Sequence, residues 1–122
     1  MYNQNKLAIR QLVLISILLA IVVVSLGAYA RLTHAGLGCP DWPGCYGMID
    51  VPVSAEQLDK AKQAFPDQVV DPEKAWNEMI HRYFAGALGL LILVIAFLSF
   101  RNRRQGTPLR LPLLILVIVT FQ

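Results

Sequence analysis

The sequence has few charged residues: Asp, Glu, Lys and Arg together make up 16% of its 122 positions. A soluble globular domain carries about 25%. The apolar residues come in blocks, and residues 12–30 and 83–100 contain no charged residue. Because about 20 apolar residues cross a hydrocarbon core of roughly 30 Å, each block is long enough for a transmembrane helix. The composition argues against a soluble protein and predicts an all-α, polytopic membrane helical bundle.

Acidic residues are missing from both ends of the sequence. All 8 lie between positions 41 and 78, whereas the N-terminus and residues 101–110 carry only basic residues. Lys and Arg gather in the short cytoplasmic loops of membrane proteins. We therefore expect a multi-pass protein of a bacterial inner (cell) membrane, with a cytoplasmic N-terminus and residues 31–79 in the periplasm or extracellular space. No aromatic residues alternate with the basic ones, so the expected partner is the lipid bilayer and not nucleic acid.

Proline and capping residues divide the chain. Ser54 and Gln57 have the spacing of a capping box, Asp71-Pro72 is a helix-start signal, and no proline follows before residue 100. The predicted segments are a span at 11–30, an outer loop at 31–71 with a short helix at 55–65, a helix at 72–100 that includes the second span, a cytoplasmic loop at 101–110, and a partial third span at 111–122. A helix ending in mid-bilayer would leave carbonyl groups unpaired, so we expect a fragment of a longer protein. A signal peptide ending at Ala28-Tyr29-Ala30 is the alternative for the first block, which is longer than the usual apolar region.

Cysteine is also scarce, with Cys39 and Cys45 as the only 2 in the sequence. A structural zinc site takes four ligands, and His34 would add at most one, which argues against zinc. Two interpretations stay open. In an oxidising compartment the pair can form a static disulfide that staples the loop. It can also be a reducible pair that exchanges with a thioredoxin-like partner.

Glu78 and His81 are ionisable residues at the predicted outer edge of the second span, where such groups are functional candidates. In one interpretation His81 ligates haem iron, and Glu78 orients the ring or handles protons. In the other, His81 is an interfacial polar residue and Glu78 pairs with Arg82. Arg31 and Arg82 face a similar choice, because each can bind a haem propionate or anchor a helix at the interface.

Two blocks of the sequence resemble haem A synthases. The first reads Gly-Ala-Tyr-Ala-Arg-Leu-Thr at 27–33 and Gly-Leu-Gly-Cys-Pro-Asp-Trp-Pro-Gly-Cys-Tyr-Gly at 36–47. The second reads Glu-Met-Ile-His-Arg at 78–82, followed by Ala-Gly at 85–86. They resemble the exit of that family's first helix, its first outer loop and the start of its second helix. The resemblance covers roughly residues 20–95.

The resemblance implies a complete protein of two four-helix bundles, about eight spans, of which this chain holds two spans and part of a third. It implies oxidation of the methyl group of haem O to the formyl group of haem A for assembly of the terminal oxidase. His81 matches a haem-ligating histidine, Glu78 a catalytic acid, and Cys39 and Cys45 a disulfide or redox pair of one family branch.

The resemblance also implies parts that the chain lacks. The fourth-helix histidine and the second bundle, with its b-type haem, lie outside the 122 residues. We therefore expect this fragment alone to be inactive. Haem O synthase and a thiol–disulfide reductant are candidate partners of the complete protein.

Two alternative functions stay open. A non-catalytic b-type cytochrome membrane subunit would use His81 but not Glu78. A thiol–disulfide membrane assembly factor would use Cys39 and Cys45 and would tolerate the loss of His81.

Overall fold

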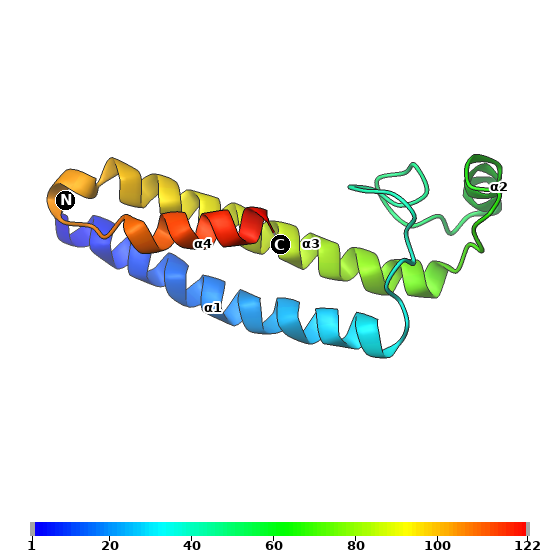
Figure 1. Cartoon of the computed structure of the whole chain (residues 1–122), viewed down its shortest axis with the longest axis horizontal. Helices are drawn as coiled ribbons and strands as arrows, with labels where there is room; N and C mark the ends of the chain where they lie inside the picture. Colours follow the sequence, from blue (N-terminus) through cyan, green and yellow to red (C-terminus); the bar gives the residue numbers. More distant parts are fainter. Residues whose placement is uncertain (1, 122) are drawn as a thin grey trace. The chain divides into compact units, whose positions relative to one another are not determined.

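The computed structural model describes residues 2–121, which form a chain of helices (Figure 1). The elements are α1 (Tyr2–Leu32), α2 (Ala55–Ala64), α3 (Pro72–Arg101), the 3-10 helix η1 (Arg103–Gln105) and α4 (Arg110–Thr120). No strand occurs in the described range, where Cys45 and Met48 form an isolated β-bridge. Residues Gln4–Leu32 and Pro72–Arg101 form helices long and apolar enough to cross a membrane. The predicted class, an all-α membrane helical bundle, is confirmed.

The surface of α1 is apolar, as a lipid-facing helix requires. Leu18 and Val24 are 66% and 70% exposed, and apolar surface on this scale marks contact with membrane or protein and not with water. The hydroxyl of Ser16 donates to the Leu12 carbonyl oxygen at 2.8 Å. This polar group is thus satisfied within the helix, which lowers the cost of placing it in an apolar environment.

Local signals set where α2 and α3 begin. At α2, Ser54 Oγ accepts the Gln57 N–H at 3.2 Å, and Gln57 Oε1 accepts the Ser54 N–H at 3.1 Å. This is the capping box that the sequence predicts, and α2 ends two residues before Pro66. At α3, Asp71 Oδ1 accepts the Glu73 N–H at 3.1 Å, while Pro72 occupies the first helical position. Each cap satisfies N–H groups that have no partner inside the helix.

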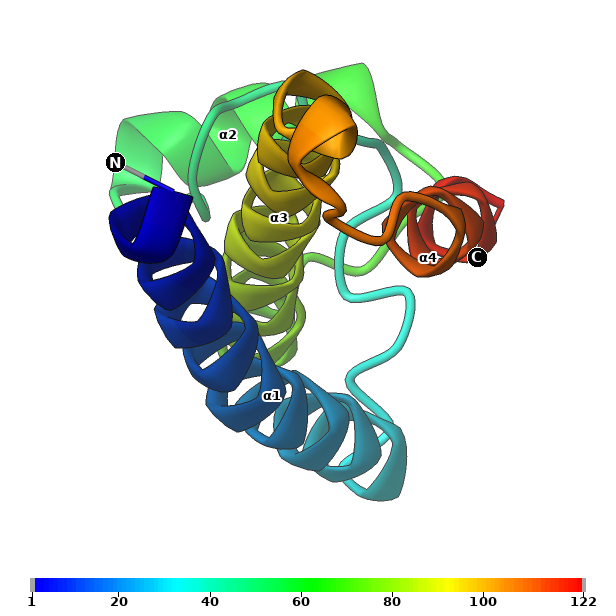
Figure 2. The same cartoon turned by 90° about the vertical axis from the view of Figure 1, so that its left-hand side faces the viewer.

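The chain divides into two compact units, one formed by Val23–Tyr83 and the other by the first part of α1 with the chain from Phe84 onward. In the latter unit, α1, α3 and α4 line an open groove of about 560 Å³. Figure 2 shows α4 nearly end-on and α1 and α3 obliquely. The lining is apolar and includes Val13, Ile92, Leu111 and Ile115.

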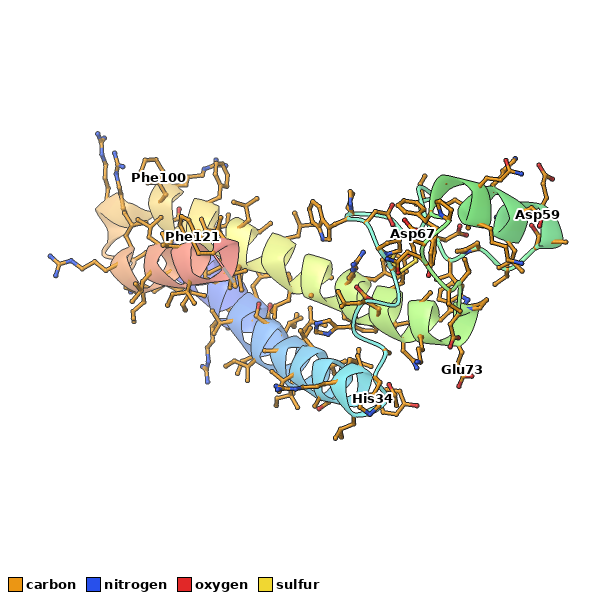
Figure 3. The ribbon with its side chains drawn as sticks, turned by 45° about the vertical axis from the view of Figure 1, so that its right-hand side comes forward. His34, Asp59, Asp67, Glu73, Phe100 and Phe121 are labelled. Carbon is orange, nitrogen blue, oxygen red and sulfur yellow. A yellow bond between two sulfur atoms is a disulfide. The ribbon has the colours of Figure 1, made fainter. Side chains whose placement is uncertain are left out.

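The unit Val23–Tyr83 contains a small hydrophobic core around the outer loop. Its buried members are Cys39, Cys45, Tyr46, Val51, Ala61, Ala75 and Met79. Phe65 packs its ring edge-on against Tyr46, with the ring centroids 5.8 Å apart. The acidic side chains of Asp59, Asp67 and Glu73 lie at the surface of this unit (Figure 3). The predicted outer loop is therefore a packed structure and not a flexible connection.

Candidate functional site

A tight reversal at the end of α1 brings the loop back onto α3. The Ala35 N–H donates to the Ala30 carbonyl oxygen at 2.8 Å, and the intervening His34 is exposed, with φ at 53°. The loop backbone then touches α3 at Gly38. A Cβ at this position would stand 2.8 Å from the carbonyl carbon and oxygen of Lys74, so only glycine permits this approach. The contact places the next residue, Cys39, directly on α3.

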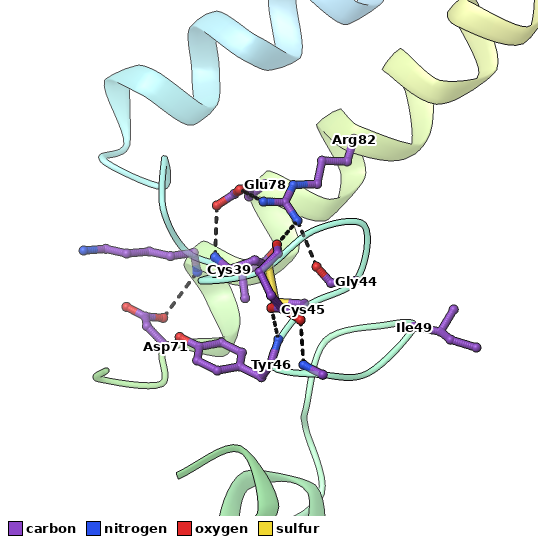
Figure 4. The surroundings of a disulfide bond; sticks show 12 residues. Cys39, Gly44, Cys45, Tyr46, Ile49, Asp71, Glu78 and Arg82 are labelled. Carbon is purple, nitrogen blue, oxygen red and sulfur yellow. Dashed lines mark hydrogen bonds and ion pairs between the residues drawn. A yellow bond between two sulfur atoms is a disulfide. The ribbon is translucent and has the colours of Figure 1, made fainter. Parts of the chain in front are cut away.

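Cys39 and Cys45 form a disulfide that closes a small ring beside α3 (Figure 4). The two residues are only 3% and 0% exposed. The Cys39 sulfur also lies 3.8 Å from the Ala75 carbonyl oxygen. The pair is therefore part of the core of this unit, and its sulfur atoms are shielded from solvent.

Glu78 and Arg82 of α3 hold this ring by its backbone (Figure 4). The Cys39 N–H donates to Glu78 Oε2 at 3.0 Å, and the other carboxylate oxygen pairs with Arg82. Arg82 Nη1 donates to the carbonyl oxygens of Asp41 at 2.7 Å and Gly44 at 2.9 Å. The side chains of Glu78 and Arg82 are 14% and 19% exposed. The i,i+4 ion pair considered from the sequence is thus present, and the same two residues clamp the loop.

Asp41 stabilises the ring from within. Its two carboxylate oxygens accept the N–H groups of Tyr46 at 2.6 Å and Gly47 at 2.7 Å. Tyr46 and Gly47 both have positive φ, 53° and 76°. Hydrogen bonds to an ionised carboxylate are about twice as strong as neutral ones, so Asp41 offsets the cost of the backbone conformation at Tyr46. Gly47 adopts its positive φ without such a cost.

His81 lies on α3 against α1. A Cβ on Gly27 would stand 2.9 Å from the imidazole Cε1 and 3.4 Å from Nδ1. His81 Nδ1 is buried and has no hydrogen-bond partner among residues 2–121. Because buried polar atoms in native proteins nearly always have a partner, this nitrogen is a candidate ligand atom for a metal or haem iron. Glu78 contacts Cys39 and Arg82 instead of the imidazole.

The structure brings together Glu78, Arg82 and the disulfide, whereas Arg31 is exposed at the end of α1. The sequence reasoning missed the roles of Gly27, Gly38 and Asp41. Two glycines gave a signal for close contacts: Gly27 lies within an apolar helix, and Gly38 lies next to Cys39. Asp41 gave a weaker signal, as an acidic residue between the two cysteines.

Tyr46 supplies a pH-dependent test of this packing. Burial, followed by the charges of Asp71, Asp41 and Glu78, raises its pKa above the usual value of 10.0. Its hydroxyl donates to the Val69 carbonyl oxygen at 3.3 Å. Because the folded state holds this proton more tightly, the stabilisation is complete below the unfolded pKa and is lost as pH rises through the folded pKa. Spectrophotometric titration should show a late-ionising phenol that Tyr46→Phe removes; an unchanged titration curve would contradict the assignment.

Comparison with known proteins places the chain in a family. The profile of a family described as cytochrome oxidase assembly protein matches residues 10–122. The chain belongs to this family of cytochrome oxidase assembly proteins. A curated relative from Shewanella oneidensis, named heme A synthase, is 52% identical over 108 residues, which cover 88% of this chain. The resemblance to haem A synthases is thereby confirmed. The chain spans 32% of the length of that relative, and no solved structure matches it significantly.

Proposed function

We propose that the complete protein is a haem A synthase, a membrane oxidoreductase that converts the methyl group of haem O to the formyl group of haem A. The observation that carries this proposal is the buried, unpartnered Nδ1 of His81 beside Gly27. The relative named heme A synthase, 52% identical to the chain, supports the same function.

The residues present fit a haem substrate. Haem iron takes a histidine nitrogen as an axial ligand, and no described side chain competes for His81 Nδ1. Arg31 is exposed and close in sequence to the α1 exit, so it is available to a propionate. Arg82 already donates to two carbonyl oxygens and pairs with Glu78, and a propionate would have to share its guanidinium.

Glu78 is proposed to accept protons during the oxidation. With water as the oxygen source, converting a methyl group to a formyl group releases protons and an equal number of electrons. The electrons must pass to an acceptor outside this chain, and a carboxylate near the reacting group can accept a proton. The Cys39 N–H and Arg82 fix both oxygens of Glu78, so the group is held in place before substrate binds. This role separates the enzyme from a b-type cytochrome subunit, which has no need for a positioned acid.

Burial favours a static role for the disulfide. Thiol–disulfide exchange requires access of an attacking thiolate to a sulfur atom, whereas Cys39 and Cys45 are 3% and 0% exposed. The alternative of a thiol–disulfide assembly factor is therefore less well supported. A reductant can reach the sulfur atoms only after the loop opens, and it is a proposed partner on that condition.

The remaining parts of the proposal follow the family resemblance. They are an inner-membrane location with residues 31–79 outside, a complete protein of two four-helix bundles, a b-type haem in the second bundle, and haem O synthase as a partner. The segments 11–30, 31–71, 72–100, 101–110 and 111–122 keep their proposed assignments as spans and loops.

Haem extraction from a host that accumulates haem O tests the proposal. Membranes that contain the complete reading frame are expected to yield haem A on chromatography. Membranes that contain only the 122 residues are expected to yield none, because the second bundle is missing. If the complete protein gives only haem O and haem B, the synthase proposal fails and the cytochrome alternative gains support.

A further inference from the structure

The outward face of the disulfide loop carries large apolar side chains. Trp42 is 79% exposed and Ile49 is 90% exposed. In Figure 4 the Ile49 side chain points away from the ring and from α3. Their exposure contrasts with the burial of Cys39 and Cys45 in the same loop.

Hydrogen bonds set the position of Trp42 and Ile49 along the axis of α3. Arg82 Nη1 donates to the carbonyl oxygens of Asp41 and Gly44, on either side of Trp42. The Tyr83 hydroxyl donates to the Ile49 carbonyl oxygen at 3.2 Å. Trp42 and Ile49 are therefore attached at the level of residues 82–83.

That level is where the apolar part of α3 begins. Residues 83–100 contain no charged residue, whereas Arg82 comes directly before them and its ion partner Glu78 lies one helical turn earlier. The loop is thus joined to α3 at the expected boundary between water and hydrocarbon. Tryptophan is enriched at such boundaries because its ring is apolar and its N–H is polar.

The charged groups nearest Trp42 are bound within the loop or to α3, and one exposed carboxylate lies beside Ile49. The Asp41 carboxylate accepts two backbone N–H groups, and Arg82 is paired with Glu78 and with loop carbonyls. Asp50 is exposed beside Ile49. A charged carboxylate is costly to bury in hydrocarbon, so Asp50 is compatible with lipid headgroups but opposes deeper insertion.

We propose that Trp42 and Ile49 dock the disulfide loop into the headgroup region of the membrane that α3 crosses. The surface is continuous with Tyr83, the first residue of the apolar run, which is itself 46% exposed. The partner of this apolar surface is the interface of the lipid bilayer. This inference depends on α3 crossing the membrane and is independent of haem binding.

The chain contains 2 tryptophans, Trp42 and Trp76, which allows a matched fluorescence experiment. Trp76→Phe leaves Trp42 as the fluorophore, and Trp42→Phe leaves Trp76. Trp76 lies seven residues before Tyr83 on α3, or roughly 10 Å further from the apolar run. The 122-residue chain is reconstituted in phosphatidylcholine vesicles with lipids brominated near the carbonyl group or near the chain end. Carbonate extraction, circular dichroism and a non-reducing gel confirm insertion, folding and the disulfide beforehand.

We expect the lipid brominated near the carbonyl group to quench Trp42 at least twofold more than it quenches Trp76. The same lipid should also quench Trp42 more than the lipid brominated near the chain end does. Aqueous iodide should quench Trp42 less than Trp76. Equal quenching of both tryptophans by lipid, or stronger quenching of Trp42 by iodide, overturns the proposal. Protection of Trp42 from both quenchers also overturns it, because protein would then cover this surface.

Discussion

Replacing His81 by Ala in the complete protein is expected to abolish haem A formation, and Gly27→Val is expected to do the same while leaving the imidazole in the sequence. His81 supplies the proposed ligand atom, and Gly27 gives it room. A Cβ at position 27 would stand 2.9 Å from Cε1 of the imidazole, closer than van der Waals contact allows. The ring must therefore turn away, and a haem ligand displaced by about 1 Å loses its geometry. Gly27→Ala should give a weaker form of the same defect.

A loss of helix stability cannot explain the defect expected in Gly27→Ala. Ala in a helix is about 1 kcal/mol more favourable than Gly, so loss of haem in Gly27→Ala cannot come from weakening α1. The readouts are the haem absorption spectrum of the purified protein and haem A in membrane extracts. Gly36→Ala is the matched control, because a Cβ there meets nothing within 4 Å. A normal haem spectrum in Gly27→Val, at equal expression, would show that His81 is not positioned by this contact.

The second large effect is expected from Arg82→Gln, which should release the disulfide loop from α3. The substitution removes two hydrogen bonds to loop carbonyls and leaves Glu78, only 14% exposed, without its ion partner. Breaking such a pair from one side costs about 3 kcal/mol. Exchange of the hydrogen-bonded amides of Cys39, Cys45, Tyr46 and Gly47 should accelerate roughly 100-fold, since each 1.4 kcal/mol is about a factor of ten.

Lys60→Gln is the control for Arg82→Gln. Lys60 and Glu56 also form an i,i+4 ion pair, but their side chains are 66% and 77% exposed. Such surface pairs contribute about 0.5 kcal/mol, so exchange in α2 should change little. Slow exchange of the loop amides in Arg82→Gln would mean that the hydrophobic core alone holds the loop.

The features predicted from the sequence are those with local or compositional causes. The apolar runs gave the long helices, and the Ser54–Gln57 spacing gave the start of α2. The i,i+4 rule also identified Glu78 as a partner of Arg82. Each of these depends on residues a few positions apart or on the average polarity of a segment.

The contacts that build the site have no such local cause. Glu78 accepts the N–H of Cys39, which lies 39 positions away, and every residue except proline offers an N–H. The approach of Gly27 to His81 depends on how α1 meets α3 within Val23–Tyr83. A glycine can indicate a close approach, but the pattern of single residues does not identify the distant residue that makes it.

The attachment of the loop to α3 has a consequence for how freely its side chains can change. Glu78 binds the loop through a backbone N–H, and Arg82 binds it through two backbone carbonyl groups. A substitution at Trp42 leaves all three of these groups in place. Position 42 is therefore a site where evolution, or an experimenter adding a fluorescent amino acid, can alter the outer surface without detaching the loop from the helix.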